Sequence, residues 1–264
     1  MQYMGGKHRQ GKHIGAFVNR WRKPGQVYWE PFVGTMGALC HIESGVGPVY
    51  ASDFCGPLVA LLCAVQGGWI PPAEEITEEQ YRWYKEGNGE PRMRAFVGFG
   101  CSYGGKWFGG LARDKAGTAG RRKGRRNFTA RASDLLVKRM SKIPKGTAFL
   151  TGDYARLGRI WFQRNTLVYC DPPYRDHIGH WGKRSRFDSD QFFGWVREMS
   201  DRGHDMLVSE YAVPADFVKV VDLKNKRNFC PRPLEGGPRD AGETGEGLFV
   251  LAGSGLHQRW LTDR

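Results

Sequence analysis

Apolar and polar positions within the first 66 residues form two strand-and-helix units. Apolar stretches rich in β-branched and aromatic residues are typical of strands, whereas a longer apolar stretch bounded by glycines is typical of a buried helix. The predicted elements are, in chain order, a strand over residues 27–33, a helix over 38–42, a strand over 48–53 and a helix over 58–65. This order predicts a doubly wound α/β sheet.

The same pattern returns in the second half of the chain. The predicted elements there are strands over residues 148–153, 166–171, 205–210, 217–221 and 248–251, with a helix over residues 189–200. The segment between the two halves differs, because residues 71–90 are polar with a helical pattern and residues 135–141 predict a short helix. We therefore expect one α/β domain over residues 1–66 and 148–264, interrupted by an inserted domain over residues 67–147.

The composition is that of a globular chain with a basic excess. The 264 residues include 40 lysines and arginines against 27 aspartates and glutamates, a formal net charge of +13, and 40% are hydrophobic. The longest strongly apolar run, residues 58–65, is far shorter than the roughly 20 residues that cross a bilayer. The N-terminus has no apolar secretory segment. We expect a soluble cytoplasmic protein with no membrane contact and a polyanionic partner; a merely solvated basic surface is the alternative.

The positive charge is concentrated in the predicted insert. Between Lys106 and Lys145 the chain has 13 basic residues and only two acidic ones. Arginine and lysine bind nucleic-acid phosphates, and arginine also reads guanine edges, so we expect nucleic-acid contact here; a solvated loop is the alternative. The candidate binding residues are Lys106, Arg113, Arg121, Arg122, Lys123, Arg125 and Arg126. Aromatic residues and glycines over residues 96–110 could stack on bases or form a small local core.

Cysteine and histidine spacing gives no sign of a metal centre. The six cysteines stand at positions 40, 55, 63, 101, 170 and 230, and no pair has Cys-x-x-Cys spacing. Cys40 adjoins His41, but no second pair of ligands accompanies them. We therefore expect no bound metal, and reduced thiols in a reducing compartment.

The turn after the first predicted strand is a candidate cofactor site. Residues 30–37 (Glu-Pro-Phe-Val-Gly-Thr-Met-Gly) place glycines between a strand and a helix, where a ligand can approach the backbone closely. Asp53 ends the next predicted strand, where an acid can accept hydrogen bonds from ribose hydroxyls. The full glycine motif of dinucleotide-binding proteins is missing, so a nucleoside cofactor without a pyrophosphate fits better. An ordinary turn, with Asp53 as a helix cap, is the alternative.

The second candidate site is the tetrapeptide Asp-Pro-Pro-Tyr at residues 171–174, which follows an apolar strand. The Asp171 carboxylate and a fixed backbone carbonyl are both hydrogen-bond acceptors, so together they suit an amino group with two N–H donors. The two prolines stiffen the backbone and remove two donors, and the Tyr174 ring can stack on a planar base. A proline-stiffened loop without chemistry is the alternative.

Taken in order along most of the chain, these motifs resemble the DNA adenine-N6 methyltransferases of the Dam type (D12 class), in particular the phage-encoded members. Residues 3–7 (Tyr-Met-Gly-Gly-Lys) resemble their N-terminal motif, and residues 30–37 resemble their S-adenosylmethionine loop. Asp53 resembles their ribose-binding acid, residues 152–154 the segment over the cofactor adenine, and residues 171–174 the catalytic tetrapeptide. The family places its target-recognition domain where the basic insert falls. The resemblance implies a Rossmann-like S-adenosylmethionine-dependent methyltransferase sheet with an inserted basic target-recognition domain.

The resemblance also implies roles for individual residues. The cofactor-binding residues would be Tyr3, Lys7, Phe32, Gly34, Asp53, Asp153, Tyr154 and Asp171. The catalytic residues would be Asp171, Pro172, Pro173 and Tyr174. They would act on N6 of an adenine flipped out of double-stranded DNA, with S-adenosylmethionine as the methyl donor.

One position departs from the family pattern. The family has Phe-x-Gly-x-Gly in the cofactor loop, whereas this chain has Met36 at the second glycine, followed by Gly37. Gly37 could replace the missing glycine one residue later. Two alternatives keep the same chemistry, with RNA adenine or the N4 amino group of cytosine as acceptor. A third is a DNA-binding protein of this fold with weak or lost catalysis.

Overall fold

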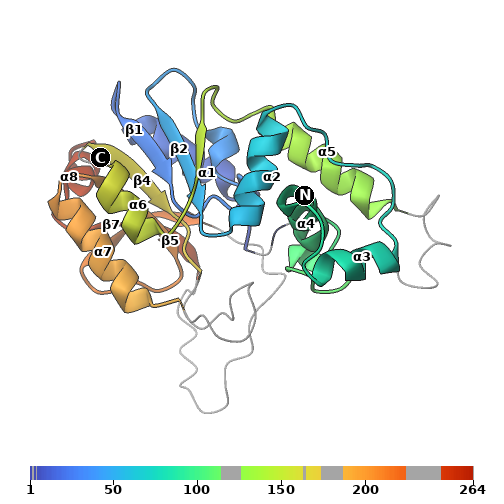
Figure 1. The fold of residues 1–264 in the computed structure, drawn as a ribbon. Coiled ribbons are helices and arrows are strands. Elements are labelled where there is room, and N and C mark those ends of the chain that lie inside the picture. Colours follow the sequence, from blue (N-terminus) through green and yellow to red (C-terminus); the bar gives the residue numbers. More distant parts are fainter. Residues whose placement is uncertain are drawn as a thin grey trace, which may run out of the picture.

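A computed structural model shows a mixed α/β fold, in which a seven-stranded sheet carries helices on both faces (Figure 1). The structure describes residues 1, 3, 5–113, 126–162, 165–173, 187–223 and 245–263, without the side chain of Trp161. The strands are β1 (Val27–Glu30), β2 (Val49–Asp53), β3 (Ala148–Thr151), β4 (Thr166–Cys170), β5 (Asp205–Glu210), β6 (Phe217–Leu223) and β7 (Glu246–Leu251). The helices are α1 (Gly11–Trp21), α2 (Gly56–Gln66), α3 (Glu78–Lys85), α4 (Pro91–Ala95), α5 (Phe128–Met140), α6 (Tyr154–Trp161), α7 (Ser189–Asp201) and α8 (Gly255–Thr262). Shorter helical turns are η1 (Leu39–His41), η2 (Phe96–Gly100) and η3 (Tyr103–Gly105).

The strand order places a topological switch point between β1 and β4. The order is β3-β2-β1-β4-β5-β7-β6. Strands β1 to β5 run parallel, whereas β7 is antiparallel to both β5 and β6. The chain leaves β1 toward β2 and β3 and later returns to β4 on the other side of β1. Open α/β sheets bind ligands outside the carboxyl ends of their strands at such a point, so the residues after β1 and β4 face the expected ligand crevice.

Both faces of the sheet are covered by apolar side chains. On one face, Ile14 of α1 belongs to the same buried cluster as Tyr28 of β1. On the other face, Leu157 of α6 and Phe192 of α7 belong to the cluster of Trp29. The neighbours Tyr28 and Trp29 therefore point to opposite faces, as the two-residue period of a strand requires. Burial of each large apolar side chain stabilises the fold by about 1.5–3 kcal/mol.

The predicted insert forms helices beside α2, at one side of the sheet (Figure 1). Both α4 and α5 pack against α2. Phe96, Phe99 and Leu136 of this segment belong to the same buried cluster as Ile14, so residues 67–147 share an apolar core with one face of the sheet. The assignment of these residues to a separate inserted domain stays a prediction.

Two predicted elements are shorter in the structure. The strand predicted over residues 27–33 ends at Glu30, since Pro31 has no N–H to donate to a sheet ladder. The helix predicted over residues 38–42 is a single 3-10 turn, Leu39–His41. The residues after β1 are therefore mostly loop, which leaves their backbone available to a ligand.

Several helices are longer than predicted or were not predicted at all. The helix predicted over residues 135–141 begins at Phe128, because the Asn127 side chain accepts a hydrogen bond from the backbone N–H of Ala130 and caps it. Helices α6 and α8 were not predicted. Asp153 caps α6 and Ser254 caps α8, and a polar cap of this kind was the available sign of a helix start.

Candidate active site

The loop after β1 folds tightly against the N-terminal segment. Gly34 has a left-handed φ of +48°, and a Cβ atom there would lie 3.1 Å from the Tyr3 ring. Met36 has a φ of 62° and is fully buried, although L residues rarely adopt this conformation. Gly37 is not left-handed, but a Cβ on it would lie 2.9 Å from the backbone nitrogen of Lys7. The left-handed backbone thus falls at Met36, where the family has its second glycine, and the close backbone approach falls at Gly37.

Asp53 closes the same loop from the end of β2. Its Oδ2 accepts a hydrogen bond from the Gly34 N–H at 3.1 Å, and its Oδ1 accepts one from the Cys55 N–H at 2.9 Å. Burial raises the pKa of Asp53 to about 6, and the two amides oppose that rise. The next residue, Phe54, is 75% exposed. Sequence reasoning missed Phe54, although its place directly after Asp53 could have indicated it. A carboxylate beside an exposed aromatic ring suits a nucleoside, which offers hydroxyl donors and a planar base.

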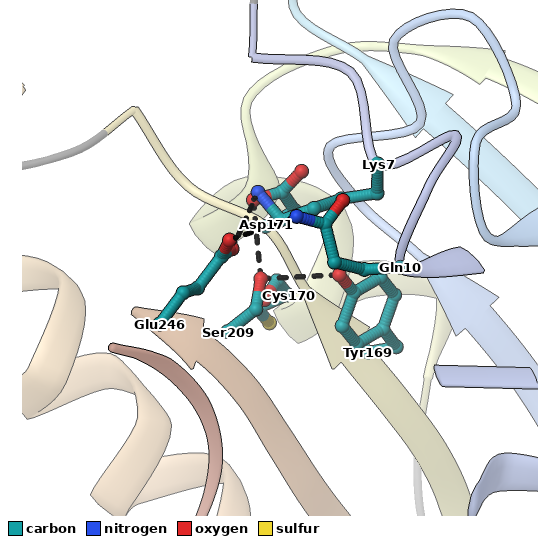
Figure 2. A network of polar contacts seen from close by, with 7 residues as sticks. All are labelled: Lys7, Gln10, Tyr169, Cys170, Asp171, Ser209 and Glu246. Carbon is teal, nitrogen blue, oxygen red and sulfur yellow. Dashed lines mark hydrogen bonds and ion pairs between the residues drawn. The ribbon is translucent and has the colours of Figure 1, made fainter. Parts of the chain in front are cut away.

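Asp171 follows β4 at the switch point and is held by two side chains (Figure 2). Lys7 Nζ lies 2.6 Å from Asp171 Oδ1 and 2.9 Å from Glu246 Oε1. Ser209 Oγ donates a hydrogen bond to the same Asp171 oxygen at 3.1 Å, and the Tyr169 hydroxyl lies 3.0 Å from Ser209 Oγ. Both contacts of Asp171 use Oδ1. The carboxylate is therefore fixed in orientation by groups on two separate segments, the N-terminal segment and β5.

The charges of this network favour an ionised Asp171. The side chains of Lys7 and Glu246 are only 4% and 2% exposed. Burial by itself lowers the pKa of Lys7, but Asp171 and Glu246 outweigh burial and raise that pKa above its ordinary value. Burial raises the pKa of Asp171, and the Lys7 ammonium opposes that rise. A protonated Lys7 thus stabilises the carboxylate form of Asp171, which is the form that only accepts hydrogen bonds.

Tyr3 connects the cofactor loop to this network. Its ring lies against Gly34, and its hydroxyl is buried. Burial raises the pKa of Tyr3 well above its ordinary value, and the nearby Asp53 and Asp171 carboxyls raise it further. The structure therefore brings Tyr3, Gly34, Asp53 and Asp171 of the predicted site into one region, together with Lys7.

Two other predicted residues, Phe32 and Tyr154, lie in an aromatic group on the face of the sheet that α6 and α7 cover. The Phe32 and Tyr154 rings have centroids 5.2 Å apart, and Tyr154 lies 4.9 Å from Trp195. Burial raises the pKa of Tyr154 to about 12. Asp153 Oδ1 accepts hydrogen bonds from the N–H groups of Ala155 and Arg156 at 3.0 and 3.1 Å. Asp153 thus caps α6, and its contact with a cofactor stays a prediction.

The tetrapeptide after β4 is described in part. Pro172 is buried and Pro173 is exposed, whereas Tyr174 lies outside the described residues. The predicted stacking of Tyr174 on a base is therefore untested.

Two residues of this network, Glu246 and Ser209, were not among the predicted site residues. Glu246 begins β7, which lies on the other side of β5 from β4, and its carboxylate contacts Lys7. No feature of the sequence marks this residue. For Ser209, its position near the end of a strand parallel to β4 was the available sign.

The basic candidates are only partly described. Lys106 and Arg126 are exposed, and the Arg126 guanidinium lies over the Phe128 ring. Arg113 forms an ion pair with Glu78. Arg121, Arg122, Lys123 and Arg125 lie outside the described residues. DNA binding by this segment stays a prediction.

In the described part of the chain, no helix has the length and apolar character to cross a membrane. No group of three or more histidine, cysteine, aspartate or glutamate side chains there is arranged to hold a metal ion.

A family comparison agrees with this geometry. Residues 111–228 match the model of the D12 class N6 adenine-specific DNA methyltransferases. The match covers fewer than half of the residues, and it includes Asp171, Ser209 and strands β3 to β5. It supports the resemblance to this family and a methyltransferase enzyme. The family and the fold together imply the use of S-adenosylmethionine.

Comparisons with whole proteins are more distant. No curated protein matches this chain. The rRNA methyltransferase aviRa from Streptomyces viridochromogenes is 16% identical, with 92% of this chain and 84% of that chain covered and a TM-score of 0.41. TrmN from Thermus thermophilus is 13% identical, with coverages of 90% and 47% and a TM-score of 0.35. An rRNA methylase from Streptococcus thermophilus is 8% identical, with coverages of 91% and 94% and a TM-score of 0.35. These likenesses are too distant to transfer a substrate to this chain.

Proposed function

We propose that this protein transfers a methyl group from S-adenosylmethionine to N6 of an adenine flipped out of double-stranded DNA. The observation that carries the proposal is Asp171, an oriented acceptor carboxylate at the switch point, followed by the buried Pro172. The family match over residues 111–228 supports adenine as the base and DNA as the polymer. Assignment to the phage-encoded subgroup, and with it the host-cell cytoplasm as the place of action, depends on the sequence resemblance alone.

The described residues fit the proposed cofactor. The proposed cofactor residues are Tyr3, Lys7, Phe32, Gly34, Asp53, Asp153, Tyr154 and Asp171. The left-handed Gly34 has no Cβ, which lets the Tyr3 ring pack directly on the loop backbone. Asp53 would accept hydrogen bonds from the ribose hydroxyls, and the exposed Phe54 ring would cover the adenine of the cofactor. When bound, S-adenosylmethionine supplies an electrophilic methyl group.

The acceptor amine would be positioned by Asp171 and Pro172. An amino group conjugated to a purine ring is a poor nucleophile, because its lone pair is delocalised. The Asp171 carboxylate and the Pro172 carbonyl would each accept one N–H bond of N6 and so turn the lone pair toward the methyl group. Lys7 would keep Asp171 ionised and fixed in place, and Tyr174 would stack on the flipped base. In the direct in-line displacement, the N6 lone pair would bond to the methyl carbon as the carbon–sulfur bond breaks, the neutral thioether would leave, and N6 would release its extra proton to solvent. Positioning and electrostatic stabilisation would supply most of the rate enhancement.

The basic segment would hold the DNA while the base is flipped. Extrusion of an adenine costs a few kcal/mol, and contacts between basic side chains and phosphates offset that cost through the release of counterions. Lys106, which begins this segment, and Arg126, within it, are exposed to such contacts.

The test is methyl transfer followed by nucleoside analysis. The protein is incubated with methyl-labelled S-adenosylmethionine and either unmethylated double-stranded DNA or RNA, and the polymer is digested to nucleosides. Label in N6-methyldeoxyadenosine supports the proposal, and Asp171→Ala should abolish it while cofactor affinity stays within a few-fold. Label in N6-methyladenosine from RNA would show that the substrate is RNA adenine, and label in N4-methylcytosine would show that it is cytosine. DNA binding without any label would indicate a protein of this fold that has lost catalysis.

A further inference from the structure

Glu210, the last residue of β5, carries a buried carboxyl group that the mechanism above does not use. Its side chain is 6% exposed. The N–H of the following residue, Tyr211, donates a hydrogen bond to the carboxyl, whereas Oε2 is buried and has no hydrogen-bond partner among the residues that the structure describes. A buried polar atom without a partner costs about 1–3 kcal/mol. Such an atom in a folded protein calls for a functional explanation.

The position of Glu210 is at the active-site edge of the sheet. In the parallel register of β4 and β5, Cys170 pairs with Val208, and the next residues of the two strands, Asp171 and Ser209, are hydrogen-bonded. Continuation of the same register places Glu210 beside Pro172. The atom without a partner therefore belongs to a residue next to the two groups proposed to hold the acceptor amine.

The surroundings of Glu210 favour its neutral form. The charged groups acting on it come from three segments: Asp171 after β4, Lys7 of the N-terminal segment and Glu246 of β7. Burial raises the pKa of Glu210 to about 8; the Tyr211 N–H and Lys7 lower it, and Asp171 and Glu246 raise it. One ammonium thus faces three carboxyl groups. At neutral pH the Glu210 carboxyl carries its proton and offers an O–H donor as well as acceptor oxygens.

We propose that Glu210 donates a hydrogen bond from its protonated carboxyl to the unprotonated ring nitrogen adjacent to the acceptor amine. This inference rests on the proposed function and deepens it. In adenine that nitrogen is N1, an acceptor beside N6 on the same edge of the base. Asp171 and Pro172 would accept from the amine while Glu210 donates to the ring. The site would then recognise an amine next to a bare ring nitrogen.

The same pattern gives discrimination among bases. Guanine and thymine carry a hydrogen on the corresponding ring nitrogen, which would oppose the Glu210 O–H, and they have an oxygen where adenine has its amine. Cytosine offers an amine and a bare N3, so Glu210 by itself would not separate cytosine from adenine. The residue thus defines the chemical class of the acceptor, an amino-substituted ring with an adjacent acceptor nitrogen.

The test compares Glu210→Gln and Glu210→Leu with the unaltered protein and with Glu43→Gln, a control at an exposed carboxylate. The value of kcat/KM is measured for transfer from S-adenosylmethionine to unmethylated plasmid DNA between about pH 6 and about pH 9.5, a range that brackets the titration of Glu210. Leucine removes the hydrogen bond, so Glu210→Leu should be about 10-fold slower at neutral pH. Glutamine keeps a donor and an acceptor, so Glu210→Gln should stay within about threefold.

The pH profile separates a substrate contact from a structural role. Activity of the unaltered protein should fall as the pH rises through about 8, because the donor is lost. Glu210→Gln should lack this fall, since an amide does not titrate. If Glu210→Leu does not fold, the pH profile of Glu210→Gln alone distinguishes a substrate contact from a structural role. If the unaltered protein is active and Glu210→Gln shows the same fall in activity at alkaline pH, this inference is overturned but the proposed function is not. An unaltered protein that methylates no nucleic acid overturns the proposed function, and this inference with it.

Discussion

Lys7 and Asp171 are 164 positions apart in the chain, yet Lys7 Nζ lies 2.6 Å from Asp171 Oδ1. The same ammonium lies 2.9 Å from Glu246 Oε1. Two carboxylates, Glu246 at 2% and Asp171 at 16% exposed, thus share one buried cation, in surroundings that screen charge less than water does. Tyr3, four residues before Lys7 in the chain, packs on Gly34. One short N-terminal segment therefore contacts both the cofactor loop and the proposed catalytic carboxylate.

Removal of the shared cation should destabilise the protein strongly. Lys7→Met leaves Asp171 and Glu246 buried without a counter-charge, and the expected loss is about 3–5 kcal/mol of unfolding free energy. Glu246→Gln should cost less, because Lys7 keeps Asp171 as a partner. When Glu246→Gln is combined with Lys7→Met, the loss of unfolding free energy that it adds should be smaller than in the unaltered protein or should become a gain. The coupling energy between the two substitutions should be about 1 kcal/mol or more. Urea denaturation measures all three.

The matched control is the exposed ion pair of Arg20 and Asp263, whose side chains are 62% and 53% exposed. Arg20→Met should cost no more than about 1 kcal/mol, as exposed pairs do. A loss for Lys7→Met that is no larger than the loss for Arg20→Met would contradict the importance of burial at this site.

The left-handed backbone at Met36 makes an unusual prediction for stability. Met36→Ala and Met36→Gly both remove a fully buried side chain and should cost about 2–5 kcal/mol. At an ordinary site glycine is the worse replacement, but at a φ of 62° it relieves strain of roughly 1–2 kcal/mol. Met36→Gly should therefore be the more stable of the two variants in urea denaturation. The reverse order would show that the strain is not present in solution.

Cofactor affinity should weaken in acid because of Asp53. Its pKa is raised to about 6, first by burial, so the carboxylate proposed to accept hydrogen bonds from the ribose hydroxyls is lost as the pH falls through that value. At about pH 5 only about one tenth of the protein is ionised at Asp53, and the apparent Kd for S-adenosylmethionine should rise about tenfold. Isothermal titration measures this change. Asp53→Asn should bind more weakly than the unaltered protein at neutral pH and show a flatter pH dependence; an equal dependence would remove Asp53 from the cofactor site.

Neutralisation of the basic segment should affect DNA and not the cofactor. With Arg121, Arg122, Arg125 and Arg126 replaced by glutamine, DNA binding should weaken and the slope of log K against log salt should become less steep, by up to about 0.9 for each lost phosphate contact. The affinity for S-adenosylmethionine should stay unchanged. An equal loss of cofactor affinity would contradict the separation of a DNA-binding segment from the methyl-transfer crevice.

Local patterns in the chain are enough to predict the order of the main elements and the position of the catalytic candidate. Periodicity, glycine turns and proline are local properties, so the strands that become β1, β2, β4 and β5 were predicted with small shifts at their ends. For the same reason the tetrapeptide at residues 171–174 was placed correctly at the carboxyl end of a strand. The concentration of charge in residues 106–145 also needed no structure.

Which of these residues meet depends instead on long-range packing. Glu246 joins Lys7 and Asp171 because β7 is inserted between β5 and β6, and strand pairing over such separations leaves no local trace in the chain. The left-handed Met36 depends on packing of the N-terminal segment against residues 34–37. The buried, half-satisfied carboxyl of Glu210 depends on what surrounds the end of β5. Long-range packing sets burial and charge environment, and these decide which acids accept a proton and which hold a base.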